Sequence, residues 1–95
     1  MLTLRLIDPD DYTVHDDGQL IGRIRYTGEH AAGLWLWTII VPIPGASSGD
    51  AKTLDEAMAR FKSVWVAFKA RQGAEKLTKV FAEMNHANRP DRYRQ

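Results

Sequence analysis

The sequence predicts an α+β fold, in which a three- or four-stranded antiparallel sheet packs on one long helix and a second helix follows near the carboxyl end. Two observations carry this prediction. Short segments of strand-like residues, separated by turn residues, fill the first half of the chain. One apolar stripe with spacings of three and four residues fills much of the second half. The 95 residues suffice for one domain, placed at residues 1–88, and residues 89–95 are expected to be a flexible basic tail.

Four segments of the first half are expected to be strands. Residues 2–6 alternate weakly between apolar and polar side chains, and residues 12–15 form a short second strand. Asp17-Gly18 can supply the positive φ angles of a tight hairpin turn, so residues 19–26 are expected to return beside residues 12–15. Residues 34–41 are the strongest strand, because they are rich in aromatic and β-branched side chains.

A loop is expected after the strongest strand. Pro42 and Pro44 end that strand, because proline cannot donate a hydrogen bond to a neighbouring strand. Residues 42–50 contain two prolines, two glycines and two serines, so we expect a mobile segment that binds no ligand. The segment lacks the spacing of a phosphate-binding loop, since three residues rather than four separate Gly45 from Gly49.

Two helices are expected in the second half. The first covers residues 53–71, where Thr53 and Glu56 match a capping box and Gly73 is a stop signal. The centre of its apolar stripe, at Phe61 and Trp65, should pack on the sheet. The second helix runs from about residue 74 to about residue 85 and has one apolar side: Leu77, Val80, Phe81 and Met84. This side can cover the second face of the sheet, pack beside the first helix, or meet its copy in a dimer.

A series of short motifs runs through the middle of the chain: Tyr12-Thr13-Val14, Asp17-Gly18, Ile21-Gly22-Arg23-Ile24, Trp35-Leu36-Trp37-Thr38 and a helix ending near Trp65. In these motifs residues 11–66 resemble a group of small, uncharacterised alphaproteobacterial proteins. The resemblance implies a β-hairpin, a third strand and a helix. It implies no activity, cofactor or site residue.

The charge distribution raises the question of a nucleic-acid partner. The first 59 residues have a net charge of −5 and the remaining 36 have a net charge of +6. Such a split can mark an acidic or nucleic-acid partner, or attraction between the two halves within one fold. In the first helix, Lys62 and Lys69 flank the apolar stripe on the side opposite Arg60 and Arg71, which weakens the case for a basic face. The candidate contacts to nucleic acid are Arg23, Arg25, Lys62, Lys69, Lys76 and Lys79.

Trp35 and Trp37 share one face of a strand, because they are two residues apart. Exposed aromatic side chains near arginines can stack on nucleobases. A small core also needs large aromatic side chains, and we expect at least one of the two tryptophans to be buried. Both faces of residues 34–41 are apolar, so we expect the second face of the sheet to be covered by other residues or by a second copy.

Catalytic and metal chemistry find little support in the sequence. There is no cysteine, which excludes thiol catalysis and cysteine-ligated zinc. The aspartates lack the spacing of a calcium loop and are expected to serve turns: Asp8, Asp10, Asp11, Asp16 and Asp17. The histidines have no metal-ligand spacing: His15, His30 and His86. We therefore expect no enzyme activity, no cofactor and no metal site.

The function predicted from the sequence is that of a small non-catalytic interaction module, acting through a protein partner or as a homodimer. Nucleic-acid binding through the basic half and the sheet aromatics is the alternative. No apolar run approaches the length of a membrane span, so we expect no membrane association and a cytoplasmic location.

Overall fold

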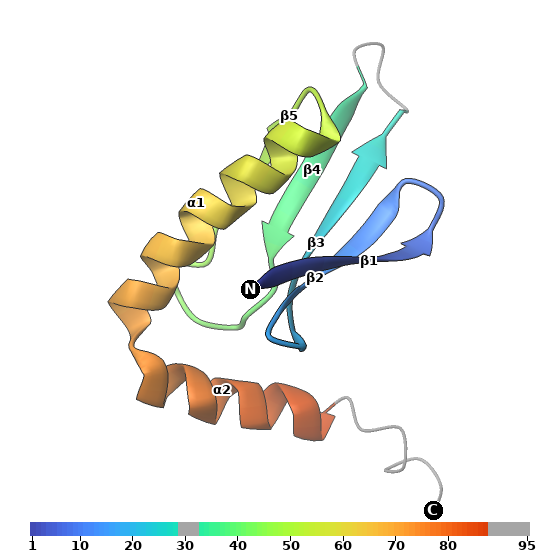
Figure 1. The fold of residues 1–95 in the computed structure, drawn as a ribbon. Coiled ribbons are helices and arrows are strands. Elements are labelled where there is room, and N and C mark those ends of the chain that lie inside the picture. Colours follow the sequence, from blue (N-terminus) through green and yellow to red (C-terminus); the bar gives the residue numbers. More distant parts are fainter. Residues whose placement is uncertain (29–32, 88–95) are drawn as a thin grey trace, which may run out of the picture.

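The computed structural model describes residues 1–28 and 33–87, which form an antiparallel sheet followed by two helices (Figure 1). The α+β class is confirmed. His30 and the expected basic tail at residues 89–95 lie outside the described residues. The five strands lie side by side in chain order: β1 (Leu2–Asp8), β2 (Asp11–Asp16), β3 (Gln19–Thr27), β4 (Leu34–Ile39) and β5 (Ser48–Ala51). The helices are α1 (Leu54–Gln72) and α2 (Ala74–Ala87).

The turns between the first three strands use the residues that the sequence favours. Asp17 and Gly18 have φ angles of 50° and 85°, which confirms the predicted hairpin between β2 and β3. Asp10, in the turn between β1 and β2, has a φ angle of 58°. Aspartate tolerates this left-handed conformation better than most residues, so these acids do serve the turns.

The fifth strand corrects two expectations, the three- or four-stranded sheet and the mobile loop over residues 42–50. Ser48, Gly49 and Asp50 belong to β5, which pairs with β4. A β-carbon on Gly49 would lie 2.6 Å from the indole ring of Trp37, so only glycine lets this segment lie against that ring. Val41 and Ile43 are also buried, which anchors the segment between β4 and β5.

Helix α1 begins and ends as predicted. The Thr53 side chain caps it by accepting a hydrogen bond from the backbone N of Glu56 at 3.1 Å, and Gly73 ends it with a φ angle of 85°. The apolar stripe is buried at Ala57, Phe61, Trp65 and Phe68. Phe61 and Trp65 are each 1% exposed, which confirms their place in the core.

One face of the sheet lies against α1. Gly22 on β3 faces the helix, and a β-carbon there would collide with the Phe61 ring. Ile24 points to the same side, because side chains alternate along a strand. Arg23 and Arg25 therefore lie on the opposite face of β3. Figure 1 shows α1 running obliquely over β4 and β5, while β1 and β2 curl away from the helix at their far ends.

Helix α2 does not cover the second face of the sheet. It lies across one end of the molecule, beneath the β2–β3 turn (Figure 1), where Leu77 is buried in the core. The side-chain amides of Gln19 and Asn85 exchange hydrogen bonds of 3.3 and 3.0 Å, which fix the helix to that turn. Within the described residues, Thr38 and Ile40 stay exposed on the face away from α1. The described residues of this chain therefore do not cover the second face fully, and coverage by a second copy stays a prediction.

Candidate functional site

A groove of about 670 Å³ separates the start of β1 from one flank of α1. Its floor is apolar and includes Val14 and Ile24 from the sheet, while Phe61 and Trp65 form part of the helix wall. The groove exists because α1 packs against β3, β4 and β5, so no helix among the described residues covers β1. The helix contributes a rim of apolar and basic side chains: Met58, Ala59, Lys62, Val66 and Lys69.

Strand β1 presents its edge, as well as one face, to this groove. Residues 1–4 are consecutive and all line the groove, although side chains alternate between the two faces of a strand. In the part of the chain that the structure describes, β1 pairs only with β2. The outer edge of β1 is therefore a row of backbone donors and acceptors open to another strand.

Backbone geometry identifies which residues of β1 point outward. The Asp17 amide donates to the Met1 carbonyl oxygen at 3.1 Å, so the backbone of Met1 faces β2. Antiparallel strands alternate between residues that bond to one neighbour and residues that bond to the other. Thr3 and Arg5 hence also face β2, where they pair with His15 and Thr13. The backbone groups of every second residue point to the open edge: Leu2, Leu4 and Leu6.

Exposed apolar side chains gather around this edge. Leu6 and Ile7 on β1 are 60% and 50% exposed, and Val66 on α1 is 56% exposed. Met1 and Met58 are the other two large apolar residues of this region that are exposed, whereas Tyr26 and Ile40 are the exposed large apolar residues elsewhere in the described chain. Such a concentration of apolar surface beside an unpaired strand is typical of a protein-binding surface.

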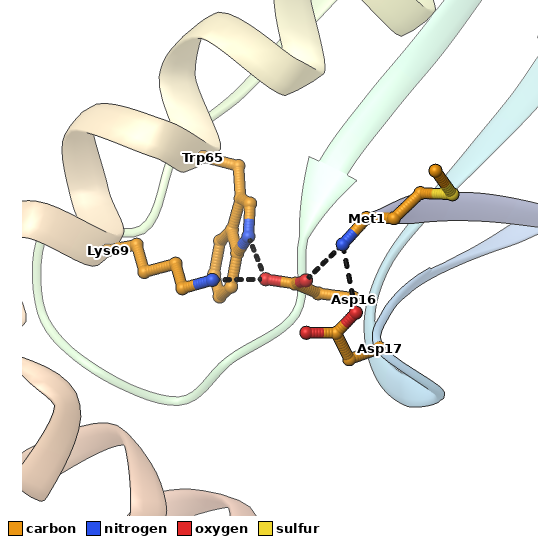
Figure 2. Close-up of polar contacts among 5 residues, drawn as sticks. All are labelled: Met1, Asp16, Asp17, Trp65 and Lys69. Carbon is orange, nitrogen blue, oxygen red and sulfur yellow. Dashed lines mark hydrogen bonds and ion pairs between the residues drawn. The ribbon is translucent and has the colours of Figure 1, made fainter.

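A polar cluster closes one end of the groove (Figure 2). Oδ2 of Asp16 accepts hydrogen bonds from Nε1 of Trp65 at 2.9 Å and from Nζ of Lys69 at 2.8 Å. Oδ1 of Asp16 lies 3.5 Å from the Met1 amino group, which also donates to Asp17 at 2.9 Å. The cluster joins the end of β2, the start of β1 and the middle of α1.

The charge of Asp16 is stabilised by these partners. The Asp16 side chain is only 9% exposed, and burial alone raises the pKa of a carboxyl group. Hydrogen bonds from Lys69 and Trp65 outweigh burial, so the pKa of Asp16 lies below its ordinary value. The hydrogen bond to Asp17 in turn raises the pKa of the Met1 amino group. The cluster therefore holds an ionised carboxylate between two cations near neutral pH.

The six residues predicted to contact nucleic acid do not share one face. Lys62 and Lys69 line the groove beside α1. Arg23 and Arg25 lie on the opposite face of the sheet, in a shallow hollow of about 330 Å³. Lys76 and Lys79 are exposed on α2.

Asp11 forms an ion pair with Arg23, one of the two arginines on this face. Its carboxylate accepts a hydrogen bond from Nε of Arg23 at 2.9 Å and forms an ion pair with the same guanidinium group. The hydrogen bond from Arg23 lowers the pKa of Asp11. Part of the positive charge on this face is therefore already matched within the chain.

Both sheet tryptophans lie on the side of α1. Trp37 is buried and meets the Phe61 ring edge-on at 6.2 Å between centroids, which confirms the expected burial of at least one tryptophan. Trp35 is half-buried and packs against Tyr26 and Tyr12, with centroid distances of 5.3 and 6.3 Å. The two tryptophans therefore lie on the face of the sheet opposite Arg23 and Arg25. A single nucleobase cannot contact both the tryptophans and these arginines.

Sequence reasoning assigned Asp16 to a turn and missed its bonds to α1. Its partners Trp65 and Lys69 lie 49 and 53 residues further along the chain, so no local pattern links them. The edge position of β1 was missed as well, because it follows from the spatial order of the strands. The weak period-2 pattern of residues 2–6 was the available signal.

The comparisons with known proteins returned no match to a family model, to a curated protein or to a solved structure. The resemblance of residues 11–66 to small alphaproteobacterial proteins stays an expectation. Among the described residues, neither helix has the length and apolar character that crossing a membrane requires.

Proposed function

We propose that this protein is a non-catalytic interaction module that accepts an extended protein segment in the groove between β1 and α1. The observation that carries this proposal is the combination of an unpaired strand edge with an apolar groove beside it. An added strand gains affinity from main-chain hydrogen bonds to β1 and specificity from side chains that enter the groove. The groove walls are made by core residues of α1, so the site is pre-formed and little ordering is needed on binding.

The composition of the groove indicates the chemistry of its ligand. Val66 and Met58 favour apolar side chains, and these would alternate along an extended segment. Lys62 and Lys69 on the rim favour an acidic residue near the ends of that segment. No reaction is assigned to the site, because its polar cluster is engaged in bonds that join β1, β2 and α1.

Selection from a displayed library of random peptides tests this function. The protein is immobilised through its carboxyl end, so that Met1 remains free. Enriched peptides should contain alternating apolar residues and should bind the wild-type protein and Ile40→Glu equally. Val66→Glu should bind them at least about tenfold more weakly, a difference of about 1.4 kcal/mol. Val66 and Ile40 are both exposed, so neither change should unfold the chain.

Two results would count against the proposal. The first is a set of peptides whose binding does not respond to Val66→Glu. The second is a library that yields no binder, together with tight binding of oligonucleotides. The latter would favour the alternative function, nucleic-acid binding, for which the hollow lined by Arg23 and Arg25 on the opposite face is the supporting observation.

A further inference from the structure

We propose that the segment which occupies the groove is β1 of a second copy of this chain, paired antiparallel with β1 across a two-fold axis at Leu4. This inference rests on the proposed function, and it names the partner. Such a contact is isologous, because each copy offers the same edge and the same groove.

The register follows from the backbone and from the side chains. In a symmetric antiparallel pair the two-fold axis passes through one residue position, and opposite residues share a face of the sheet. An axis at Arg5 would place two arginines opposite each other, and like charges in this position are destabilising. An axis at Leu6 would place Leu4 opposite Asp8. An axis at Leu4 avoids both conflicts.

With the axis at Leu4, every pair is compatible. Leu4 lies opposite Leu4, Leu2 opposite Leu6, and Thr3 opposite Arg5. The outward-pointing backbone groups of β1 belong to Leu2, Leu4 and Leu6, the residues that this register joins by hydrogen bonds. The apolar face thus pairs with itself, and the polar face pairs threonine with arginine.

This register also gives the exposed Leu6 a partner. Leu6 is 60% exposed and does not line the groove of its own chain. In the pair it comes opposite Leu2 of the other copy, where that copy's groove begins. Its side chain shares the face of Leu2 and Leu4, so it extends toward the apolar hollow beside the other strand. Burial of this surface is the main source of affinity.

The polar cluster at the end of the groove is compatible with the same arrangement. The Met1 amino group and Lys69 both contact Asp16, and the Met1 amino group also contacts Asp17 (Figure 2). Two cations and two carboxylates therefore balance within this cluster, so the second copy approaches an end of the groove whose charges are matched.

Single cysteines can report the register, because the natural chain has none. Opposite residues in a hydrogen-bonded antiparallel pair have Cα atoms about 5.5 Å apart, within reach of a disulfide. Leu4→Cys should therefore form a covalent dimer rapidly under mild oxidation. Arg5→Cys and Leu6→Cys should form one much more slowly, since their copies would be offset by two and four residues. An equimolar mixture of Thr3→Cys and Arg5→Cys should form the mixed dimer.

Sedimentation of the wild-type chain over a range of concentrations gives the independent measurement. We expect a reversible dimer, which weakens at least about tenfold in Leu6→Lys but not in Ile40→Lys. Circular dichroism confirms that each variant is folded, and Thr3, Arg5 and Leu6 are exposed enough to be changed without loss of the core. Faster cross-linking of Arg5→Cys or Leu6→Cys than of Leu4→Cys would overturn the register.

The two proposals can fail separately. A wild-type chain that stays monomeric at all concentrations, yet binds library peptides in a manner that depends on Val66, would overturn self-pairing and leave the groove as a site for another protein. A monomeric chain that binds no peptide would overturn both. A dimer that survives Leu6→Lys and forms no Leu4→Cys cross-link would place the interface elsewhere and so contradict the inference.

Discussion

The indole Nε1 of Trp65 donates a hydrogen bond of 2.9 Å to Oδ2 of Asp16, so the middle of α1 is tied to the end of β2. This bond crosses one end of the groove (Figure 2) and helps to set the distance between the helix and the sheet. A hydrogen bond to a charged group contributes more to stability than one between neutral groups. The contact therefore has consequences for both stability and the shape of the groove.

The first prediction concerns the pH dependence of stability through Asp16. Its pKa in the folded chain lies below the ordinary value of 3.8, so its ionisation stabilises the fold above that pH. The contribution is lost as the pH falls from 3.8 through the lower pKa of the folded state. Asp16→Asn should lower the free energy of unfolding by about 1.5–3 kcal/mol at neutral pH, because the charged acceptor of Trp65 and Lys69 is lost.

Urea denaturation between neutral and acidic pH measures this difference. The gap between the wild type and Asp16→Asn should close on acidification. Asp17→Asn is the matched control, since the Asp17 side chain is 80% exposed and asparagine also tolerates its positive φ angle. It should change stability little. A gap for Asp16→Asn that stays constant with pH would contradict the assigned role.

The second prediction compares two tryptophans. Trp65 and Trp37 are both buried, but Nε1 of Trp37 has no hydrogen-bond partner among the described residues. Each change to phenylalanine removes a similar volume. Trp65→Phe also removes the bond to Asp16 and should therefore cost about 1.5–3 kcal/mol more than Trp37→Phe. Chemical denaturation of both variants checks this, and equal losses would show that the bond contributes nothing net.

The third prediction concerns the close approach of β3 to α1 at Gly22. A β-carbon there would collide with the Phe61 ring and would lie 2.7 Å from the Thr38 carbonyl oxygen. Because that oxygen belongs to the backbone of β4, it cannot move aside cheaply. Gly22→Ala should destabilise the fold by about 1–3 kcal/mol through overpacking.

Thermal unfolding of Gly22→Ala measures this effect. Ser48→Ala, at an exposed position on the neighbouring sheet edge, is the control and should be close to neutral. The double variant Gly22→Ala with Phe61→Leu should lose less stability in total than the sum of the losses of the two single variants, because both changes act on one contact. An unchanged melting temperature for Gly22→Ala would mean that α1 does not lie so close to β3.

The success of the sequence predictions depended on how local the determining interactions are. Helix α1 was predicted with its ends, because Thr53, Gly73 and the buried stripe around Phe61 are features of one continuous segment. Strand β5 was missed, because Ser48–Ala51 contains no strong strand-forming run and owes its place to β4. Glycine is required at position 49 because the Trp37 ring lies beside it, and no local pattern around Gly49 reveals that contact.

The same reasoning applies to the groove. The apolar character of residues 2–6 could be read from the sequence, but whether β1 lies at an edge depends on the order of all five strands. The sequence placed Lys62 and Lys69 on one flank of the α1 stripe, and both do line the groove. That Lys62 and Lys69 lie on the other side of the sheet from Arg23 and Arg25 could not be predicted locally. It depends on which face of the sheet α1 covers and on the alternation of side chains along β3.

The last prediction concerns nucleic acid. Affinity for a phosphate backbone comes from several cations on one continuous surface, since each neutralised phosphate releases counterions. Here Arg23 and Arg25 lie on the face opposite Lys62 and Lys69, and Asp11 and Asp16 already pair with one cation of each set. Binding to short single- and double-stranded oligonucleotides at about 150 mM salt should therefore be weak and should differ little between Arg25→Ala, Lys62→Ala and the wild type. Fluorescence anisotropy measures the affinity for these oligonucleotides, with a chain lacking residues 89–95 as the test of the basic tail.

Two outcomes would contradict this prediction. Submicromolar binding that falls steeply with salt and is reduced by Arg25→Ala would make the second face of the sheet a nucleic-acid surface. Binding abolished only by the deletion would assign the whole effect to the tail.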